Sequence, residues 1–189
     1  MKTQIPYTKP LIVTSTLSLT RFYENSYSDA FDSLFNTEVM AASGGSGLCI
    51  FGCLLPETLV LKTNGLSTPI SSIQEGDIVV SFDLHTMKRT SGTVLKTYPH
   101  KSKLWDYLTI NKVLQITPNH SVYTTDNLWV SAGSLKKGDK LISPDGNAIE
   151  ITTIEKNKKE TLVYDLRIDE RYHNYFASGF LVHNQSESK

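Results

Sequence analysis

The sequence predicts an all-β domain of many short strands that begins near Cys53 and follows a segment of different character. From Cys53 onward, short runs rich in β-branched residues, such as "TLVLKTNG", "DIVVSFD" and "AIEITTIE", alternate with turn residues, as is typical of antiparallel strands. The dipeptides Asn64-Gly65 and Asp145-Gly146 favour tight hairpin turns. The same region also repeats one of its own patterns, which indicates two related halves.

The repeat relates the stretch "SSIQEGDIVVSFD" to the later stretch "GSLKKGDKLISPD". Five residues recur at one constant offset: Ser72, Gly76, Asp77, Ser81 and Asp83 are matched by Ser134, Gly138, Asp139, Ser143 and Asp145. This repetition predicts two β subdomains related by a pseudo-two-fold axis. We therefore expect the chemistry of the protein to draw on both halves.

Length and charge limit what the chain can do. Its 189 residues suffice for one well-buried domain plus an appendage. Lys plus Arg and Asp plus Glu both number 19, so the net charge gives no support for binding nucleic acid or an anionic membrane. No apolar run approaches the ~20 residues of a membrane span, and "PLIVTSTLSL" is too rich in hydroxyl groups for a signal-peptide core.

The first 48 or so residues are rich in Ser, Thr, Asn and Tyr and end in "AASGGSG", a flexible linker composition. Within them, "YSDAFDSLFNTEVMAA" has apolar residues at helical spacing, with Ser28 or Asp29 available as a cap. The apolar positions are Phe31, Leu34, Phe35, Val39 and Met40. We expect a short amphipathic helix on a tether.

Cys49 and Cys53 are the two cysteines of the chain. Two are too few for a disulfide scaffold or a zinc site, so we expect no metal and no cofactor. Cys53 follows Gly52, whose carbonyl is the least hindered to attack, and a thiol there can move the acyl group from nitrogen to sulfur. That step needs a strained or polarised peptide bond and a donor to the leaving nitrogen. The alternative is two ordinary small apolar residues.

The motif "TPNH" supplies candidates for that donor. Pro118 forces an extended or turning backbone and Asn119 tolerates unusual dihedral angles, so a turn could direct Thr117, Asn119 and His120 toward one point. A histidine can protonate a leaving nitrogen. Taken alone, a Thr and a His three residues apart carry little meaning.

Two more candidates lie in "VYDLRIDERYHNYF". Asp165 interrupts an otherwise apolar strand-like run, and His173 lies among aromatic residues. The alternatives are a turn or edge carboxylate for Asp165 and a packed, hydrogen-bonded ring for His173.

The stretch "GFLVHN" ends in His183 and Asn184. An asparagine side-chain nitrogen can attack its own backbone carbonyl, forming a succinimide and releasing the next residue as an amine. The reaction is slow in an open chain, and becomes useful when a rigid site holds the amide and a histidine protonates the leaving nitrogen. The alternative is a frayed polar tail.

Together these elements resemble the Hint family of inteins, hedgehog autoprocessing domains and bacterial intein-like domains. "CLLPETLV" is similar to the opening block of that family, "TPNH" to its Thr-x-x-His block, and "VYDL", "HNYF" and "GFLVHN" to its closing blocks. The resemblance spans residues 53–184 and leaves no room for an inserted endonuclease. It implies a horseshoe-shaped, pseudo-two-fold all-β fold, with residues 1–52 as a leader or N-terminal flank and residues 185–189 as a C-terminal flank.

The resemblance also implies residue roles. Cys53 is the nucleophile of the acyl shift at Gly52-Cys53, which Thr117, Asn119 and His120 polarise and protonate. Asp165 couples the two ends and tunes the thiol. His173 and His183 assist the cyclisation of Asn184, which breaks the Asn184-Gln185 bond.

One position departs from a splicing intein, in which a Cys, Ser or Thr follows the asparagine. Here it is Gln185, and Ser186 is displaced by about 3.3–3.6 Å along an extended chain. We therefore expect single-turnover cleavage at one or both junctions rather than efficient splicing. The substrate is the protein's own flanking chain, and the acyl acceptor is water, an external thiol or an amine. The alternatives are splicing through a non-standard acceptor and an inactive Hint-fold presentation module.

The stretch "LFNTEVMAASGG" resembles a double-glycine leader. Leu34, Glu38, Val39 and Ala42 lie where such leaders, counted back from Gly45, place Leu, Glu, Leu and an apolar residue. The resemblance implies a bacterial protein secreted through a peptidase-containing ABC exporter, with "SGLCIFG" as a peptide between leader and domain. Otherwise we expect a cytoplasmic protein.

Overall fold

The computed structural model describes residues 52–169 and 172–184, without the side chains of residues 102–104. These residues belong to the second of the two units into which the chain divides, residues 43–189. The predicted amphipathic helix and the leader-like motif lie outside the described residues. No helix in the described part of the chain is long and apolar enough to cross a membrane.

The described residues form strands joined by turns, with two short 3-10 helices, which confirms the all-β prediction. The strands are β1 (Leu59–Leu61), β2 (Ser67–Pro69), β3 (Ile78–Asp83), β4 (Lys88–Ile110), β5 (Leu114–Ile116), β6 (Ser121–Tyr123), β7 (Trp129–Ser131), β8 (Lys140–Ile142), β9 (Ala148–Glu150), β10 (Ile154–Ile168), β11 (Asn174–Ala177) and β12 (Phe180–His183). The 3-10 helices are η2 (Ile70–Ser72) and η3 (Ala132–Ser134).

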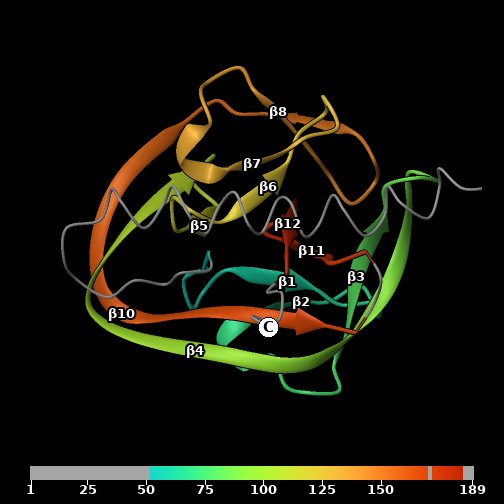
Figure 1. The fold of residues 1–189 in the computed structure, drawn as a ribbon, viewed down its shortest axis with the longest axis horizontal. Coiled ribbons are helices and arrows are strands. Elements are labelled where there is room, and N and C mark those ends of the chain that lie inside the picture. Colours follow the sequence, from blue (N-terminus) through green and yellow to red (C-terminus); the bar gives the residue numbers. More distant parts are fainter. Residues whose placement is uncertain (1–51, 170–171, 185–189) are drawn as a thin grey trace, which may run out of the picture. The chain divides into compact units, whose positions relative to one another are not determined.

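The largest sheet shows the internal symmetry that the repeat predicts. Its strand order is β2-β1-β11-β12-β6-β7, so the β1–β2 and β6–β7 hairpins lie at its two ends. The closing hairpin β11–β12 lies between them (Figure 1). The end of the sequence motif "GFLVHN" is therefore in the middle of a sheet, which excludes a frayed tail.

Both copies of the repeat fold into the same turn after a 3-10 helix. Gly76 and Gly138 have positive φ angles of 88° and 93°, a conformation that favours glycine. Next to them, the carboxylate of Asp77 accepts a hydrogen bond at 3.0 Å from the backbone N–H three residues earlier, and that of Asp139 does so at 2.8 Å. The recurring glycine and aspartate thus have a local structural cause.

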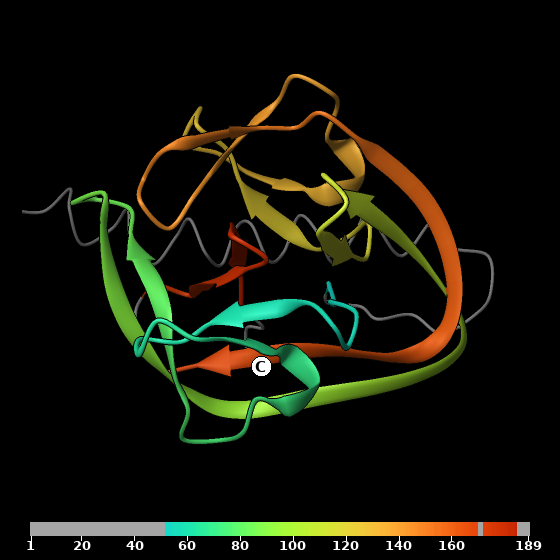
Figure 2. The ribbon, with the colours of Figure 1, turned by 180° about the vertical axis from the view of Figure 1, so that it is seen from behind.

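The two longest strands differ from the prediction of short strands only. β4 and β10 pair along their lengths and curve together around the domain (Figures 1 and 2). Pro99 in β4 concealed this strand, because proline normally interrupts a sheet. Its partner Tyr164 already exchanges both backbone hydrogen bonds with Leu54, each at 2.8 Å. The ring nitrogen of Pro99 therefore points away from β10. The proline costs no hydrogen bond between β4 and β10.

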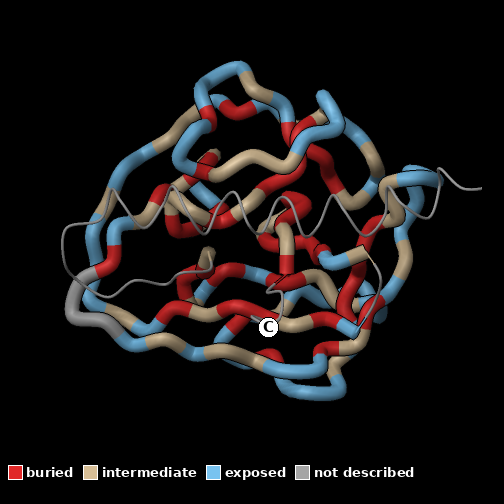
Figure 3. Tube along the Cα trace, viewed as in Figure 1, coloured by how far each residue is buried: buried red, intermediate tan, exposed pale blue. Residues whose placement is uncertain are grey.

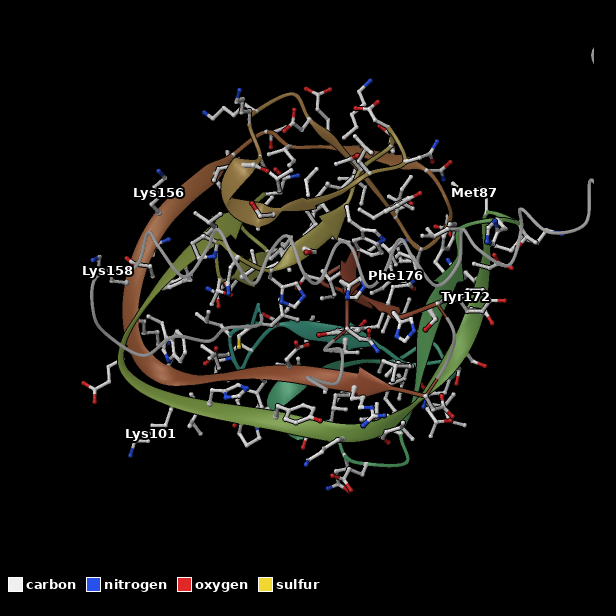
Figure 4. All side chains as sticks on the ribbon, viewed as in Figure 1. Met87, Lys101, Lys156, Lys158, Tyr172 and Phe176 are labelled. Atoms are coloured by element: carbon white, nitrogen blue, oxygen red, sulfur yellow. The ribbon has the colours of Figure 1, made fainter. Side chains whose placement is uncertain are left out.

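The β4–β10 ribbon and the central sheet differ in how far their side chains are buried. Lys101, Lys156 and Lys158 point outward from the β4–β10 ribbon, whereas Phe176 of β11 points into the domain (Figure 4). The buried residues gather on the central strands, and the turns and the outside of the ribbon are exposed (Figure 3). Every residue of β11 and β12 except His183 is buried. The hairpin that ends the domain is thus one of its most buried elements.

Candidate active site

Cys53 lies in a short extended segment between β5 and β10. Its side chain is fully buried, and Leu54 forms antiparallel bridges with Ile116 on one side and Tyr164 on the other. The Cys53 carbonyl accepts the Thr117 N–H at 2.9 Å. The backbone after the candidate nucleophile is therefore fixed from both sides.

Thr117 contacts the Gly52-Cys53 peptide directly. The Cys53 N–H, which belongs to the Gly52-Cys53 bond, donates to Thr117 Oγ1 at 2.8 Å. The Thr117 hydroxyl in turn donates to the Cys53 carbonyl at 3.2 Å. Because Thr117 is 2% exposed, both bonds are shielded from water.

The "TPNH" segment is a turn, as the sequence predicts. The His120 N–H donates to the Thr117 carbonyl at 3.1 Å, and this turn brings both side chains to the Cys53 segment. Asn119 lies half-buried on the same turn. The Gly52 backbone packs against His120 so closely that a Cβ atom at Gly52 would overlap the Cα and Cβ atoms of the histidine.

The His120 ring is buried and neutral. Burial lowers the pKa of His120 to about 4, with a smaller lowering from the charge of His183 and opposing contributions from the backbones of Gly52 and His183. Nε2 lies 3.1 Å from the His183 carbonyl oxygen, which can only accept, so Nε2 carries the proton and Nδ1 the lone pair. Nδ1 is buried and forms no hydrogen bond to any described residue.

Asp165 lies beside Cys53 on the neighbouring strand. The Leu54–Tyr164 bridge is antiparallel, so Cys53 and Asp165 are opposite each other with side chains on one face. Asp165 is 2% exposed, and burial raises the pKa of its carboxyl well above the usual range. It is a buried residue within β10 and does not lie in a turn.

The second candidate junction lies at the end of β12. The Asn184 N–H donates to the His173 carbonyl at 2.9 Å, and Asn184 is 4% exposed. In the orientation that satisfies both ends of its amide, Nδ2 donates to the His173 carbonyl at 3.0 Å and the side-chain oxygen accepts the Ile168 N–H at 3.2 Å. His183 Nδ1 lies 2.7 Å from the Asn184 carbonyl oxygen. Gln185 lies outside the described residues.

The two histidines at this junction differ in burial. The His173 ring is exposed and the His183 ring half-buried, and the rings stack at 6.3 Å with an angle of 13°. Trp129 of β7 lies edge-on to His183 at 5.0 Å. His173 has a positive φ of 52°, an uncommon conformation for a residue other than glycine.

Three further residues of this site were not predicted from sequence: Trp129, Asn174 and Tyr175. Asn174 bonds the backbone of Phe82 twice, accepting from its N–H at 2.8 Å and donating to its carbonyl at 3.0 Å. Tyr175 donates to Asp165 at 3.2 Å. The letters "HNYF" contain the signal for two of them, since a polar residue inside an apolar strand needs a partner.

Both junctions meet at one ring. The backbone of Gly52 packs against His120, and Nε2 of the same ring reaches the carbonyl of His183. The residues predicted from the opening and closing motifs are thus brought together by a residue from the middle of the chain. Among the described residues, no group of three or more His, Cys, Asp or Glu side chains could hold a metal ion.

Cys53 is disulfide-bonded in this structure. Cys49 is the only other cysteine of the sequence and lies outside the described residues. The thiol must therefore be released by reduction before it can act as a nucleophile.

The fold and these motifs agree with what comparison with known families finds. The profile of the family described as Pretoxin HINT domain matches residues 59–186. The chain belongs to the pretoxin HINT domain family. The matched range of this HINT domain includes Thr117, His120, Asp165 and Asn184 and begins after Cys53.

Solved structures of similar fold include three intein-related domains. The solution structure of a bacterial intein-like domain from Clostridium thermocellum is 31% identical, with a TM-score of 0.64, 70% of this chain covered and 98% of that chain. The gp41-1 intein is 26% identical, with a TM-score of 0.56 and coverages of 70% and 98%. The DnaB intein from Synechocystis sp. PCC 6803, 22% identical with a TM-score of 0.61 and coverages of 71% and 99%, shares the fold.

Among curated proteins, the chain is similar to part of DNA-directed RNA polymerase III subunit rpc2 of Dictyostelium discoideum. The two are 28% identical over 95 residues, which make up 47% of this chain and 6% of the polymerase subunit. The HINT relationship supports autoprocessing or splicing as the general activity of the chain.

Proposed function

We propose that this domain cleaves its own chain at Gly52-Cys53 and at Asn184-Gln185. The observation that carries the proposal is that one buried, neutral histidine, His120, packs against the first junction and bonds the carbonyl of the residue before the second. Burial of the His120 ring beside Gly52 keeps the imidazole neutral, so it is able to accept a proton there.

The first step is an acyl shift from nitrogen to sulfur. The reduced Cys53 sulfur attacks the Gly52 carbonyl carbon, the thiol proton passes to His120 Nδ1, and the C–N bond of the scissile peptide breaks. His120 then returns the proton to the Cys53 nitrogen, leaving a thioester and a free amine. Thr117 Oγ1 holds the N–H of that nitrogen at 2.8 Å, so the developing lone pair is directed away from the threonine.

Thioester formation from an amide is unfavourable, so the site must weaken the peptide bond. The close packing of Gly52 on His120 and the backbone clamp on Cys53 fix the two sides of this bond separately. We infer that the bond is held near the geometry of attack. The thioester then passes its acyl group to water, an external thiol or an amine.

The second step is the cyclisation of Asn184. Its Nδ2 attacks its own carbonyl carbon, the bond to Gln185 breaks, and a proton goes to the Gln185 nitrogen, giving a C-terminal succinimide. The His173 carbonyl, 3.0 Å from Nδ2, orients the attacking nitrogen. His183 Nδ1, 2.7 Å from the Asn184 oxygen, can donate to the oxyanion that forms there.

Cleavage is favoured over ligation because Gln185 offers no nucleophile to the thioester. Splicing through a non-standard acceptor and an inactive presentation module remain the alternatives, and intact mass spectrometry of the reduced full chain separates all three. We expect fragments that end at Gly52 when a thiol is added, and fragments that end at Asn184 without it. A ligated product would favour splicing, and an unchanged mass identical to that of Cys53→Ala would favour the inactive module.

We also propose that the N-terminal flank is a double-glycine leader read by a peptidase-containing ABC exporter. The support is the spacing of Leu34, Glu38, Val39 and Ala42 before Gly45. Incubation with such a peptidase domain should cut the full chain after Gly45. A Gly45→Val chain that is cut as fast as the wild type would contradict the proposal.

A further inference from the structure

The Asp165 carboxyl is held by a tyrosine from another strand. Its Oδ1 atom accepts the Leu166 N–H at 2.7 Å and the Tyr175 hydroxyl at 3.2 Å. Tyr175 is fully buried and Asp165 is 2% exposed. β10 and β11 are not paired in any sheet of the described residues, so this bond is a side-chain link between them.

The link joins the two junctions of the candidate site. Asp165 lies opposite Cys53, across the bridge that joins Leu54 to Tyr164. Tyr175 is two residues after His173, whose carbonyl holds both nitrogens of Asn184. A single hydroxyl thus connects the strand beside the first junction to the strand that holds the second.

Within residues 52–169 and 172–184, the Tyr175 hydroxyl is the side-chain group that donates a hydrogen bond to Asp165. Cys53 lies opposite on one side, and Tyr98 of β4 is its partner on the other. The contributions to the proton affinity of Asp165 come from burial, the Leu166 N–H and Tyr175, and no charged side chain contributes. A buried hydroxyl costs free energy unless it forms a hydrogen bond, and phenylalanine would fill the same space at position 175 without that cost.

Given the self-cleavage proposed above, we propose that Tyr175 is a positioning residue that holds the Asp165 carboxyl against Cys53 and couples the two junctions. Its hydroxyl favours the carboxylate and so partly opposes the effect of burial. Burial and Asp165 raise the pKa of Tyr175 well above its usual range, so the phenol stays protonated and keeps donating across neutral pH.

The test is Tyr175→Phe, which removes one oxygen atom and keeps the ring. We expect thiol-induced cleavage at Gly52-Cys53 to slow about tenfold at neutral pH, and its acid limb to move about one pH unit upward because the carboxylate loses a donor. The matched control is Tyr123→Phe, since Tyr123 is also buried and bonds Asn127 instead, at 3.4 Å. An identical pH profile for wild type and Tyr175→Phe would overturn the proposal.

A second measurement does not depend on cleavage. In the full chain carrying Cys53→Ala and Asn184→Ala, NMR titration of the Asp165 carboxyl carbon should give a midpoint about one unit higher when Tyr175→Phe is added. An unchanged midpoint overturns the inference, whatever the cleavage rates are. If the midpoint is raised but the wild-type chain never cleaves, the hydrogen-bond link from Tyr175 to Asp165 is supported. In that case the proposed self-cleavage is wrong.

Discussion

The two proposed junctions of this domain differ in how far the groups around them are buried. Cys53 is fixed by backbone bonds on both sides and is fully buried. Asn184 is also buried and is held by the backbones of His173 and Ile168, but the two histidine rings beside it are half-buried and exposed. The groups around Cys53 are thus enclosed by protein, whereas the histidine rings beside Asn184 reach the solvent.

Because of this difference, we expect different factors to limit the rates of the two proposed cleavages. At Gly52-Cys53 the geometry is set, so the protonation and redox states of Cys53, His120 and Asp165 should govern the rate. At Asn184 the geometry itself should be rate-determining, because cyclisation requires the amide to stay in a near-attack position.

The largest expected effect is redox control that reaches only the first junction. Because Cys53 is disulfide-bonded in the structure, non-reduced protein should show no cleavage at Gly52, and a dithiol reductant should restore it. Cleavage at Asn184 should proceed at a similar rate in both states. Mass spectrometry with and without reductant measures both.

The control for this prediction is Cys49→Ser, which removes the one other cysteine of the chain. This variant should cleave at Gly52 with a monothiol and without prior reduction. If it still needed a dithiol reductant, Cys53 would be blocked by something other than Cys49.

His120→Gln should affect both junctions, because His120 contacts both. We expect cleavage at Gly52 to fall about 10²–10⁴-fold, since the proton carrier is lost. Cleavage at Asn184 should fall about tenfold, since the His183 carbonyl loses one donor. Time courses of the two fragments from one reduced sample give both rates, and an unchanged rate at Asn184 would disprove the shared role.

Gly52→Ala should slow cleavage at the first junction and leave cleavage at the second. The new methyl group would overlap His120, so the first scissile bond must shift, and a shift of about 1 Å can cost about 10²-fold in rate. The His183 and Asn184 backbone is unaffected, and their cleavage should continue. Equal slowing at both junctions would mean that the methyl group displaces the whole His120 turn.

Asn174→Ala should act mainly on the second junction. It removes the two bonds to the Phe82 backbone and one to the Tyr172 carbonyl at 2.8 Å, which hold β11 next to His173. We expect cleavage at Asn184 to slow about tenfold and stability to fall by about 1–3 kcal/mol. Asn157→Ala, which removes a bond to Thr109 at 3.2 Å away from both junctions, is the matched control and should leave both rates unchanged.

Local patterns in the sequence predicted the fold class and the repeat, and the resemblance to the Hint family pointed to the residues that lie together around Gly52-Cys53 and Asn184. The sequence patterns missed β4 and β10 as long strands, because Pro99 and exposed lysines hide a ribbon whose stability comes from pairing across the domain. They missed Tyr175 and Trp129 for a similar reason. Their partners, Asp165 and His183, lie on other strands, and no local pattern specifies a contact between distant segments.

The smallest expected effect concerns stability against pH. Burial lowers the pKa of His120 to about 4, against about 6.5 in an unfolded chain. Between these values the unfolded state binds more protons, so His120 makes stability rise with pH. Asp165 acts oppositely, because its raised pKa lets the folded state bind more protons above about 3.9.

In the wild type the two contributions oppose each other above pH 4, and the contribution of Asp165 ends at the pH where its own carboxyl ionises in the folded protein. Asp165→Asn removes the falling contribution, so its free energy of unfolding should rise by about 1.4 kcal/mol per pH unit. His120→Gln should show the reverse slope. Urea unfolding at pH 4.5, 5.5 and 6.5 measures this, and subtracting the two curves cancels every titrating group they share. A level curve for Asp165→Asn would mean that His120 is not held neutral in the folded protein, and the proposed difference between an enclosed first junction and a more exposed second one would fail at His120.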